Sequence, residues 1–108
     1  MPADRSLSPW LEVRAGRRAG VLEVSVLGEI DLANHQQLQQ LLSSVDLNGS
    51  ARVDLDLSQL SFSDTRGALH LLDFVQRGQE SGCEVQVVGA QPAVERVLGL
   101  LTRLPDTA

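Results

Sequence analysis

The sequence has 108 residues, a formal net charge of −5, and 43% hydrophobic and 21% charged residues. This length accommodates one domain with a single core, the composition excludes an intrinsically disordered chain, and the acidic balance argues against a nucleic-acid partner. No apolar run approaches the roughly 20 residues of a membrane-spanning helix, so no membrane span is expected. All nine basic residues are arginine, which excludes the Schiff-base chemistry of lysine.

The chain ends and the single cysteine bear on the cellular compartment. Residues 1–8 are polar and are predicted to be a disordered N-terminus, residues 9–104 form the predicted domain, and residues 105–108 are a short tail. Cys83 cannot form an internal disulfide, which fits a reducing compartment. The first residues lack the apolar core of a secretory signal. Together these features favour a cytoplasmic protein.

Two strands joined by a hairpin are predicted first. Residues 10–13 and 21–27 alternate apolar and polar side chains, which is the period of a strand with one buried face. Residues 14–20 contain two glycines and are interpreted as the connection. Asp31 is then predicted to cap a helix. The apolar stripe of this helix is spaced for one core-facing edge and comprises Leu38, Leu41, Leu42 and Val45.

The second half of the chain repeats the alternation of strand and helix. Residues 51–57 are the predicted central strand, because apolar side chains alternate with two aspartates. A short polar connection follows, and a helix is predicted from residues 64–67 to about Gln79. Residues 83–88 form the next predicted strand, and Pro92 suits the first turn of a last helix.

These elements predict an α/β domain. Strands and helices alternate from Val21 onward, which favours a mixed sheet of four to five strands with crossover helices. The strands are apolar on one face only, so helices are expected mainly on one face of the sheet.

Three blocks of the sequence resemble one known family. The segment from Asp56 to Gly67, Asp-Leu-Ser-x-Leu-x-Phe-x-Asp-Thr-x-Gly, is similar to the signature of STAS domains. Gly28-Glu29-Ile30-Asp31 and residues 92–98 resemble two further blocks of that family, in the same order and spacing. The resemblance covers about residues 11–104. The family contains bacterial anti-sigma factor antagonists, stressosome modules and the cytoplasmic tails of sulfate transporters.

The resemblance implies a switching protein. In anti-sigma factor antagonists, the hydroxyl residue after the signature aspartate, here Thr65, is phosphorylated by a partner that is both anti-sigma factor and serine/threonine kinase. The unphosphorylated domain binds this partner and frees a sigma factor, whereas the phosphorylated domain does not bind. The kinase binds ATP and magnesium, so the resemblance implies no cofactor for this chain and no enzymatic activity of its own.

The residues at the start of the second helix allow more than one interpretation. The Thr65 hydroxyl is either a helix cap or a phospho-acceptor, since a helix N-terminus accommodates a phosphate. Arg66 departs from the small residue of many antagonists. It is either a solvated side chain or a cation that pairs with a phosphate or a partner carboxylate. The resemblance adds Asp31, Asp64 and Gly67 to the predicted partner-binding residues.

Phe74 completes the predicted partner surface, on helical geometry alone. Ala68, Leu71 and Leu72 cluster on one side of the predicted helix, and Phe74 projects from the opposite side, so it is predicted to be an exposed partner contact. The two histidines, His35 and His70, have no metal-ligand spacing and are expected at the surface.

The main alternative is a protein that does not switch. The same Asp-Thr-x-Gly junction is typical of constitutive STAS scaffold subunits, bound to an ABC transporter ATPase or to a stressosome-like complex. A small enzyme is disfavoured, because no catalytic constellation, metal motif or phosphate-binding glycine loop is present. The sequence leaves the oligomeric state open.

Overall fold

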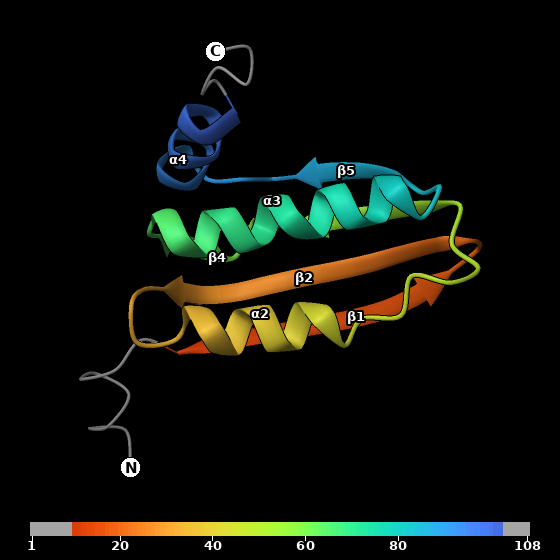
Figure 1. Cartoon of the computed structure of the whole chain (residues 1–108), viewed down its shortest axis with the longest axis horizontal. Helices are drawn as coiled ribbons and strands as arrows, with labels where there is room; N and C mark the ends of the chain where they lie inside the picture. Colours follow the sequence, from red (N-terminus) through yellow and green to blue (C-terminus); the bar gives the residue numbers. More distant parts are fainter. Residues whose placement is uncertain (1–9, 103–108) are drawn as a thin grey trace.

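The computed structural model describes residues 10–102, and the predictions for residues 1–8 and 105–108 lie outside this range. Strands and helices alternate along the described chain (Figure 1). In chain order the elements are β1 (Leu11–Arg18), β2 (Val21–Ile30), α2 (His35–Ser43), β3 (Arg52–Asp56), β4 (Leu60–Ser63), α3 (Thr65–Glu80), β5 (Glu84–Val88) and α4 (Pro92–Thr102).

The strands form one mixed sheet in the order β1-β2-β3-β5, and the short strand β4 also pairs with β2. β1 runs antiparallel to β2, whereas the other pairs are parallel. β3 pairs with the first half of β2, and β4 pairs with its last residues, from Gly28 to Ile30. The predicted mixed sheet is therefore confirmed.

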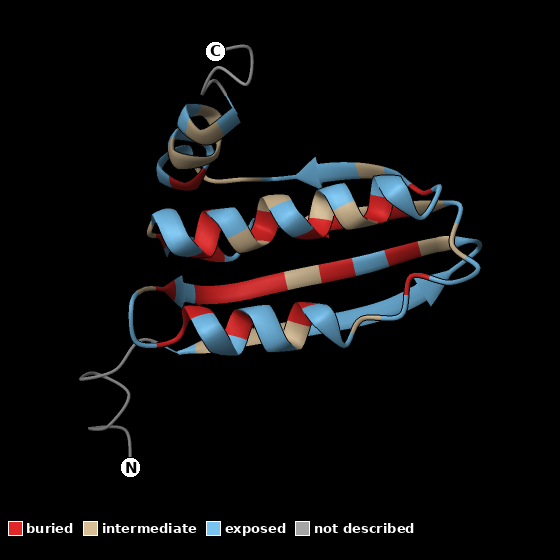
Figure 2. Ribbon diagram, in the orientation of Figure 1, coloured by how far each residue is buried: buried red, intermediate tan, exposed pale blue. Residues whose placement is uncertain are grey.

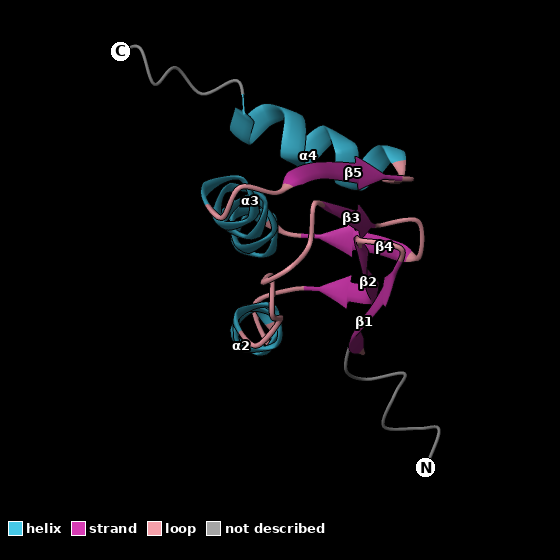
Figure 3. Cartoon of the chain, turned by 90° about the vertical axis from the view of Figure 1, so that its right-hand side faces the viewer, coloured by secondary structure: helices cyan, strands magenta, loops and turns pink. Residues whose placement is uncertain are grey.

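Helices cover one face of this sheet. α2 and α3 lie side by side on that face, and α4 packs against α3 and β4 (Figure 3). Within residues 10–102 no helix lies over the other face, where the strand register places Glu23 beside Asp54. The sequence prediction of a sheet covered mainly on one side is confirmed. Charged side chains remain solvated on the open side, which avoids the cost of burying them.

The core lies between the sheet and α2 and α3. Val24 and Val26 of β2 and Val53 and Leu55 of β3 are fully buried, and β2 carries the most continuous buried stretch (Figure 2). Burial of each such side chain contributes about 1.5–3 kcal/mol. These residues are the apolar positions of the alternating pattern, so the strand periodicity correctly identified the core face.

Two strand boundaries differ from the sequence prediction. β1 continues through Arg18, and the hairpin connection is only Ala19 and Gly20, whose φ angles of 53° and 83° are those of a tight two-residue turn. Residues 60–63, interpreted as part of a polar connection, form β4. The register shifts beside Gly28, so β4 lacks the regular alternation that marks a strand in sequence.

The first helix begins later than predicted. α2 starts at His35, and Asn34 occupies its cap position. Asp31 instead accepts a hydrogen bond from the backbone N–H of Ala33, at 2.9 Å from its Oδ1. The prediction that Asp31 caps the helix is wrong, because residues 31–34 form a separate turn that precedes it.

The predicted exposure of Phe74 is also wrong. Its side chain is 3% exposed and belongs to the hydrophobic core. The buried face of α3 includes Gly67, Leu71, Phe74 and Gly78, at the spacing of one helix face. Glycine adds nothing to a hydrophobicity pattern, so the predicted buried face was centred on Ala68, Leu71 and Leu72 and left out Phe74. The partner contact predicted for Phe74 is therefore withdrawn.

Candidate partner-binding site

The start of α3 is fixed by Asp64. Its backbone is extended, with φ −79° and ψ −179°, and its Oδ1 accepts a hydrogen bond from the Gly67 N–H at 2.9 Å. Its carbonyl accepts the first helical hydrogen bond, from the Ala68 N–H at 3.0 Å. This is the geometry of a helix N-cap, which satisfies N–H groups that have no partner within the helix.

Thr65 is the first residue of α3 and is exposed. No other described residue forms a hydrogen bond with its hydroxyl, and the capping role belongs to Asp64. The interpretation of Thr65 as the helix cap is therefore wrong. The hydroxyl lies at the positive end of the helix dipole, a position at which a negatively charged group is favourable.

Gly67 lets α3 approach the sheet. A Cβ at this buried position would overlap the side chain of Ile30, and it would come within 2.6 Å of the Ser63 Oγ. Ile30 and Ser63 are paired residues of β2 and β4, so the first turn of α3 rests directly on the ends of these two strands. This contact sets the position of Thr65 relative to the sheet.

The turn that contains Asp31 lies at the same end of the sheet. The Asp64 N–H donates to the carbonyl of Ile30 at 3.0 Å, which joins the end of β2 to the start of α3 (Figure 1). Asn34 holds the turn: its Oδ1 accepts from the Asp31 N–H, and its Nδ2 donates to the Glu29 carbonyl, each at 2.9 Å. The structure thus brings together the two segments predicted to bind the partner.

Arg66 is exposed and forms no ion pair with any of residues 10–102. Its guanidinium is free to meet a phosphate or a carboxylate, or to stay solvated, so both interpretations of Arg66 remain open. Asp31 and Asp64 place two carboxylates near the same helix start.

Two exposed leucines near Thr65 were missed by the sequence prediction. Leu32 follows Asp31 in the turn before α2, and Leu69 lies one helical turn after Thr65 on the outer side of α3. Exposed apolar side chains beside polar ones are typical of protein-protein contact surfaces. Leu32 could have been noticed in the sequence, because it directly follows the Gly-Glu-Ile-Asp block. An apolar residue in a turn between a strand and a helix does not face the core.

The two histidines lie together between α2 and α3: His35 is buried, which contradicts the predicted surface position, and His70 is partly exposed. His35 is 9% exposed, and its Nδ1 lies 3.2 Å from the Nε2 of His70. The ring centroids are 5.4 Å apart, so the two nitrogens face each other across the near edges of the rings. This geometry fits a hydrogen bond in which one ring nitrogen donates its N–H to the other.

The surroundings of His70 disfavour its protonated form. Burial, the largest effect, and then the neighbouring His35 lower the pKa of His70 below its ordinary value of 6.5. The carboxylates of Asp73 and Asp64 act in the opposite direction, and Arg66 acts in the same direction as His35. His70 therefore responds to charges at the start of α3.

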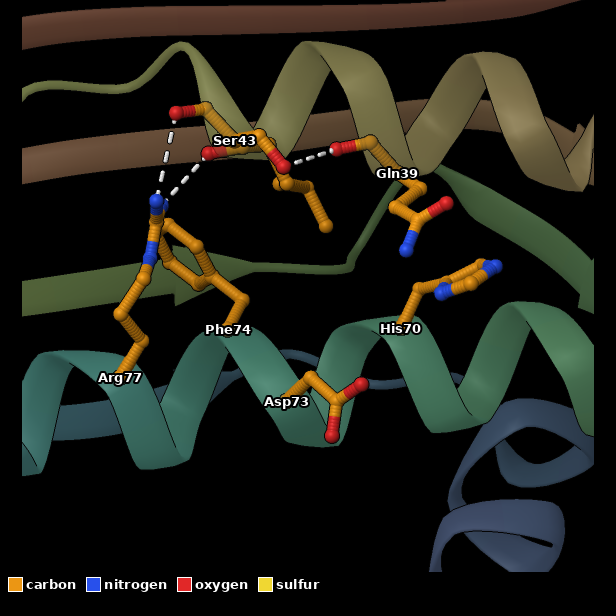
Figure 4. Close-up of a pocket in the computed structure, with 7 residues that line it drawn as sticks. Gln39, Ser43, His70, Asp73, Phe74 and Arg77 are labelled. Atoms are coloured by element: carbon orange, nitrogen blue, oxygen red, sulfur yellow. Dashed lines mark hydrogen bonds between the residues drawn. The ribbon is translucent and has the colours of Figure 1, made fainter.

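A small cavity of about 100 Å³ lies between α2 and α3, with His70 at one side and Arg77 at the other (Figure 4). Arg77 closes one end, where its guanidinium lies 5.4 Å from the ring centroid of Phe74 and donates to the carbonyls of Leu42 and Ser43. These bonds satisfy the C-terminal carbonyls of α2. The cavity has room for only a few water molecules and is a packing feature of the helix pair.

No group of three or more histidine, cysteine or carboxylate side chains within residues 10–102 is placed to hold a metal ion. In the same part of the chain, no helix combines the length and apolar character that crossing a membrane requires.

Comparisons with known proteins agree with this picture. A family model described as "Mlab, STAS domain" matches residues 12–102. The structure is similar to that of an anti-sigma factor antagonist from Mycobacterium paratuberculosis, with 28% sequence identity and a TM-score of 0.69 over 86% of this chain and 79% of that chain. No curated protein sequence matches the chain.

More distant structures share the fold. The STAS domain of an anti-sigma factor antagonist from Rhodobacter sphaeroides has 20% identity and a TM-score of 0.65, covering 77% of this chain and 94% of that chain. The murine anion transporter Slc26a9 has 23% identity and a TM-score of 0.65, covering 81% of this chain but 14% of the transporter. The same fold thus occurs as a small protein and as part of a transporter.

Proposed function

The chain belongs to the STAS family, and on this premise we propose that it is an anti-sigma factor antagonist switched by phosphorylation of Thr65. In this proposal the unphosphorylated protein binds an anti-sigma factor that is also a serine/threonine kinase, and this binding frees a sigma factor. The similarity to the Mycobacterium paratuberculosis antagonist, at 28% identity, supports this assignment.

The exposure of the Thr65 hydroxyl carries the proposal. The Asp64 carboxylate caps α3, so a kinase can modify Thr65 without removing a structural hydrogen bond. A phosphate adds about 1.5 to 2 negative charges. These charges would stand beside the carboxylates of Asp31 and Asp64, where they would repel a partner surface complementary to the unmodified site.

The proposed contact surface is the end of the molecule around Thr65. It comprises Asp31, Leu32, Asp64, Thr65, Arg66 and Leu69, whereas Gly67, also predicted to bind the partner, is buried against Ile30 and Ser63 and supports this surface. The two leucines supply apolar area. The protein acts by binding and not by catalysis. It works in the cytoplasm and needs no cofactor, since the kinase brings ATP and magnesium.

A second candidate function follows from the family model and the transporter. The matching family model favours a scaffold subunit, constitutively bound to an ABC transporter ATPase or to a stressosome-like complex, and the likeness to Slc26a9 shows that the same fold occurs within a transporter. The same surface would then serve permanent docking, with the threonine as a contact and not as a phospho-acceptor.

Peptide mapping by mass spectrometry of the protein from its native cells, under several stresses, tests the proposal. A phosphate on Thr65 with an occupancy that changes with condition is the expected result. Absence of phosphate under every condition, with an ABC ATPase co-purifying with the protein, would overturn the switch in favour of the scaffold. Thr65→Val is the control variant, because it removes the acceptor hydroxyl and keeps the side-chain shape.

A further inference from the structure

Two of the three aromatic side chains of the protein are exposed on the sheet. Trp10 is 45% exposed and Phe62 is 48% exposed, whereas Phe74 is in the core. Large exposed aromatic side chains are over-represented where proteins bind one another. Neither Trp10 nor Phe62 contributes to the Thr65 surface described above.

Glu29 lies between these two aromatic residues. Its N–H donates to the Trp10 carbonyl at 3.0 Å on the β1 side, and it pairs with Phe62 of β4 on the other side. Residues paired across neighbouring strands project to the same face. The next pair, Ile30 and Ser63, is buried under the helices, so the Glu29 row projects to the open face.

The strand spacing sets the width of this group. Neighbouring strands lie about 4.8 Å apart, so the two aromatic residues start roughly 10 Å apart, with the carboxylate between them. A flat, positively charged group can lie over the carboxylate and contact one or both rings. The open face of the sheet is visible as the side opposite α2 and α3 in Figure 3.

Glu29 is a carboxylate of the open face without an arginine ion pair, as are Asp56 and Glu84 among residues 10–102, but only Glu29 of these three has an aromatic cross-strand partner. Glu12 pairs with Arg14 at 2.6 Å, and Asp54 pairs with Arg52 at 2.8 Å. Glu23 likewise pairs with Arg18 at 3.0 Å. Among residues 10–102, no cation lies within ion-pair distance of Glu29. The aromatic pair thus flanks an exposed carboxylate that lacks a counter-ion.

We propose that Trp10, Glu29 and Phe62 form a subsite for an arginine side chain of a partner protein. Arginine matches all three groups, because its planar guanidinium stacks on aromatic rings and forms two parallel hydrogen bonds with a carboxylate. Lysine carries a compact charge without a stacking plane and binds more weakly.

A protein partner follows from the position of the subsite. Glu29 is two residues from Asp31, and Phe62 is three residues from Thr65, so the subsite continues the Thr65 surface around the end of the sheet. The carboxylates of Asp31 and Asp64 make this end attractive to a basic surface. Only the identity of the protein that supplies the arginine rests on the proposed function.

The subsite can be tested directly, because Trp10 is the only tryptophan. Its fluorescence is followed while the full chain is titrated with a blocked peptide of alternating arginine and glycine, and with its lysine and glutamate counterparts. We expect a saturable change in Trp10 emission with the arginine peptide, at a dissociation constant of about 1 mM or tighter. The lysine peptide should bind several-fold more weakly, and the glutamate peptide should cause no change.

Variants decide whether the signal comes from this subsite. Glu29→Gln should weaken arginine-peptide binding about tenfold, the loss expected for one charge-assisted contact, and Phe62→Ala should weaken it roughly three-fold, the loss of one exposed cation–π contact. Glu84→Gln, which removes another exposed carboxylate from the same face, and Leu100→Ala, which trims an exposed apolar side chain on α4, should bind like the wild type. Circular dichroism verifies that each variant is folded.

Three results would overturn the inference: no emission change up to millimolar peptide, equal affinity of lysine and arginine peptides, or equal losses in the Glu84→Gln control. The last would indicate general attraction of cations to an acidic protein. Thr65→Ala should leave peptide binding unchanged, so failure of the phosphorylation proposal and failure of the arginine subsite are distinguishable.

Discussion

At the scale of single residues, the residues that stabilise the site are different from the residue that is proposed to be modified. Asp64 provides the cap of α3, and Gly67 provides the close contact with the sheet. The hydroxyl of Thr65 is exposed and forms no hydrogen bond with another described residue. A residue placed in this way can be modified at little cost to the fold. Phe74 is the opposite case, because its side chain fills the core and has no free surface to offer a partner.

Replacement of Thr65 by glutamate should abolish partner binding and preserve the fold. A carboxylate at the first position of α3 is favourable by about 0.3–1 kcal/mol, since it lies at the helix N-terminus. Urea unfolding should therefore place this variant within about 0.5 kcal/mol of the wild type, as for other surface substitutions. Co-purification from native cells measures partner binding, and Thr65→Ser should retain it. Unfolding of the Thr65→Glu protein would instead show that Thr65 is structural.

Replacement of Phe74 by alanine should destabilise the protein by about 3–5 kcal/mol, because it leaves a cavity in the core between α3, α2 and the sheet. The free energy of unfolding in urea measures this loss. Phe62→Ala is the matched control, and its effect should be much smaller, since that ring is half exposed. Similar losses for both variants would contradict the assigned burial of Phe74.

At the scale of the elements, the start of α3 and its contact with α2 organise the site. The ends of β2 and β4 support the first turn of α3, and the turn at residues 31–34 leads from β2 into α2. His35 and His70 connect the two helices close to this end, and Arg77 connects them at the other. A change in either contact alters the position of α2 relative to Thr65.

Loss of the Asp64 cap should weaken α3. Asp64→Ala removes the acceptor for the Gly67 N–H, which should lower the free energy of unfolding by about 1 kcal/mol. Asp64→Asn should stay close to the wild type, because asparagine caps helices equally well. Thermal and urea unfolding of the three proteins provides the comparison. An asparagine variant as unstable as the alanine variant would mean that the charge of Asp64, and not its capping, is what stabilises the helix.

Stability should decrease on mild acidification because of the histidine pair. The pKa of His70 is lowered in the folded protein, so the unfolded chain binds a proton more readily, and stability rises with pH. The full contribution is present above the ordinary value of 6.5 and is lost progressively as the pH falls below it. Urea unfolding between roughly pH 7 and pH 5 measures how the free energy of unfolding changes with pH. Most carboxylates titrate below this range, so the change reports mainly on histidine.

His70→Gln is the control for this titration. It removes the proton-binding group at residue 70 and the like-charge contact with His35, so the slope of stability with pH should become smaller in this variant. An unchanged slope would assign the pH dependence to groups outside the pair.

At the scale of the whole molecule, a sheet covered on one side produces two different surfaces that meet at one end. The helix side presents Thr65 at the start of α3, and the open side presents the Trp10, Glu29 and Phe62 group. Both lie where β2 and β4 end, so a single partner can reach both. Elsewhere on the open face of the described chain, Glu12, Glu23 and Asp54 pair with local arginines, and the unpaired Asp56 and Glu84 lie on strands without an aromatic residue.

The order of every element except β4, the core face of the strands and the location of the Thr65 junction could be predicted from the amino-acid sequence. These features are encoded locally: β2 and β3 alternate in hydrophobicity, and the Asp56–Gly67 segment carries its signature within one continuous stretch. A period of two along a strand reports which side is buried, because consecutive side chains project to opposite faces. The family and the mixed α/β sheet were therefore predictable.

The contacts between side chains of distant segments could not be predicted from the sequence. The burial of Phe74 depends on α2 lying beside α3. Gly67 and Gly78 share its buried helix face but give no signal in a hydrophobicity pattern. The contact of His35 with His70 joins residues 35 positions apart. The row of Trp10, Glu29 and Phe62 depends on strand pairing and on a register shift beside Gly28. Periodicity describes one element at a time, whereas these contacts are set by how elements pack together, which no local pattern contains.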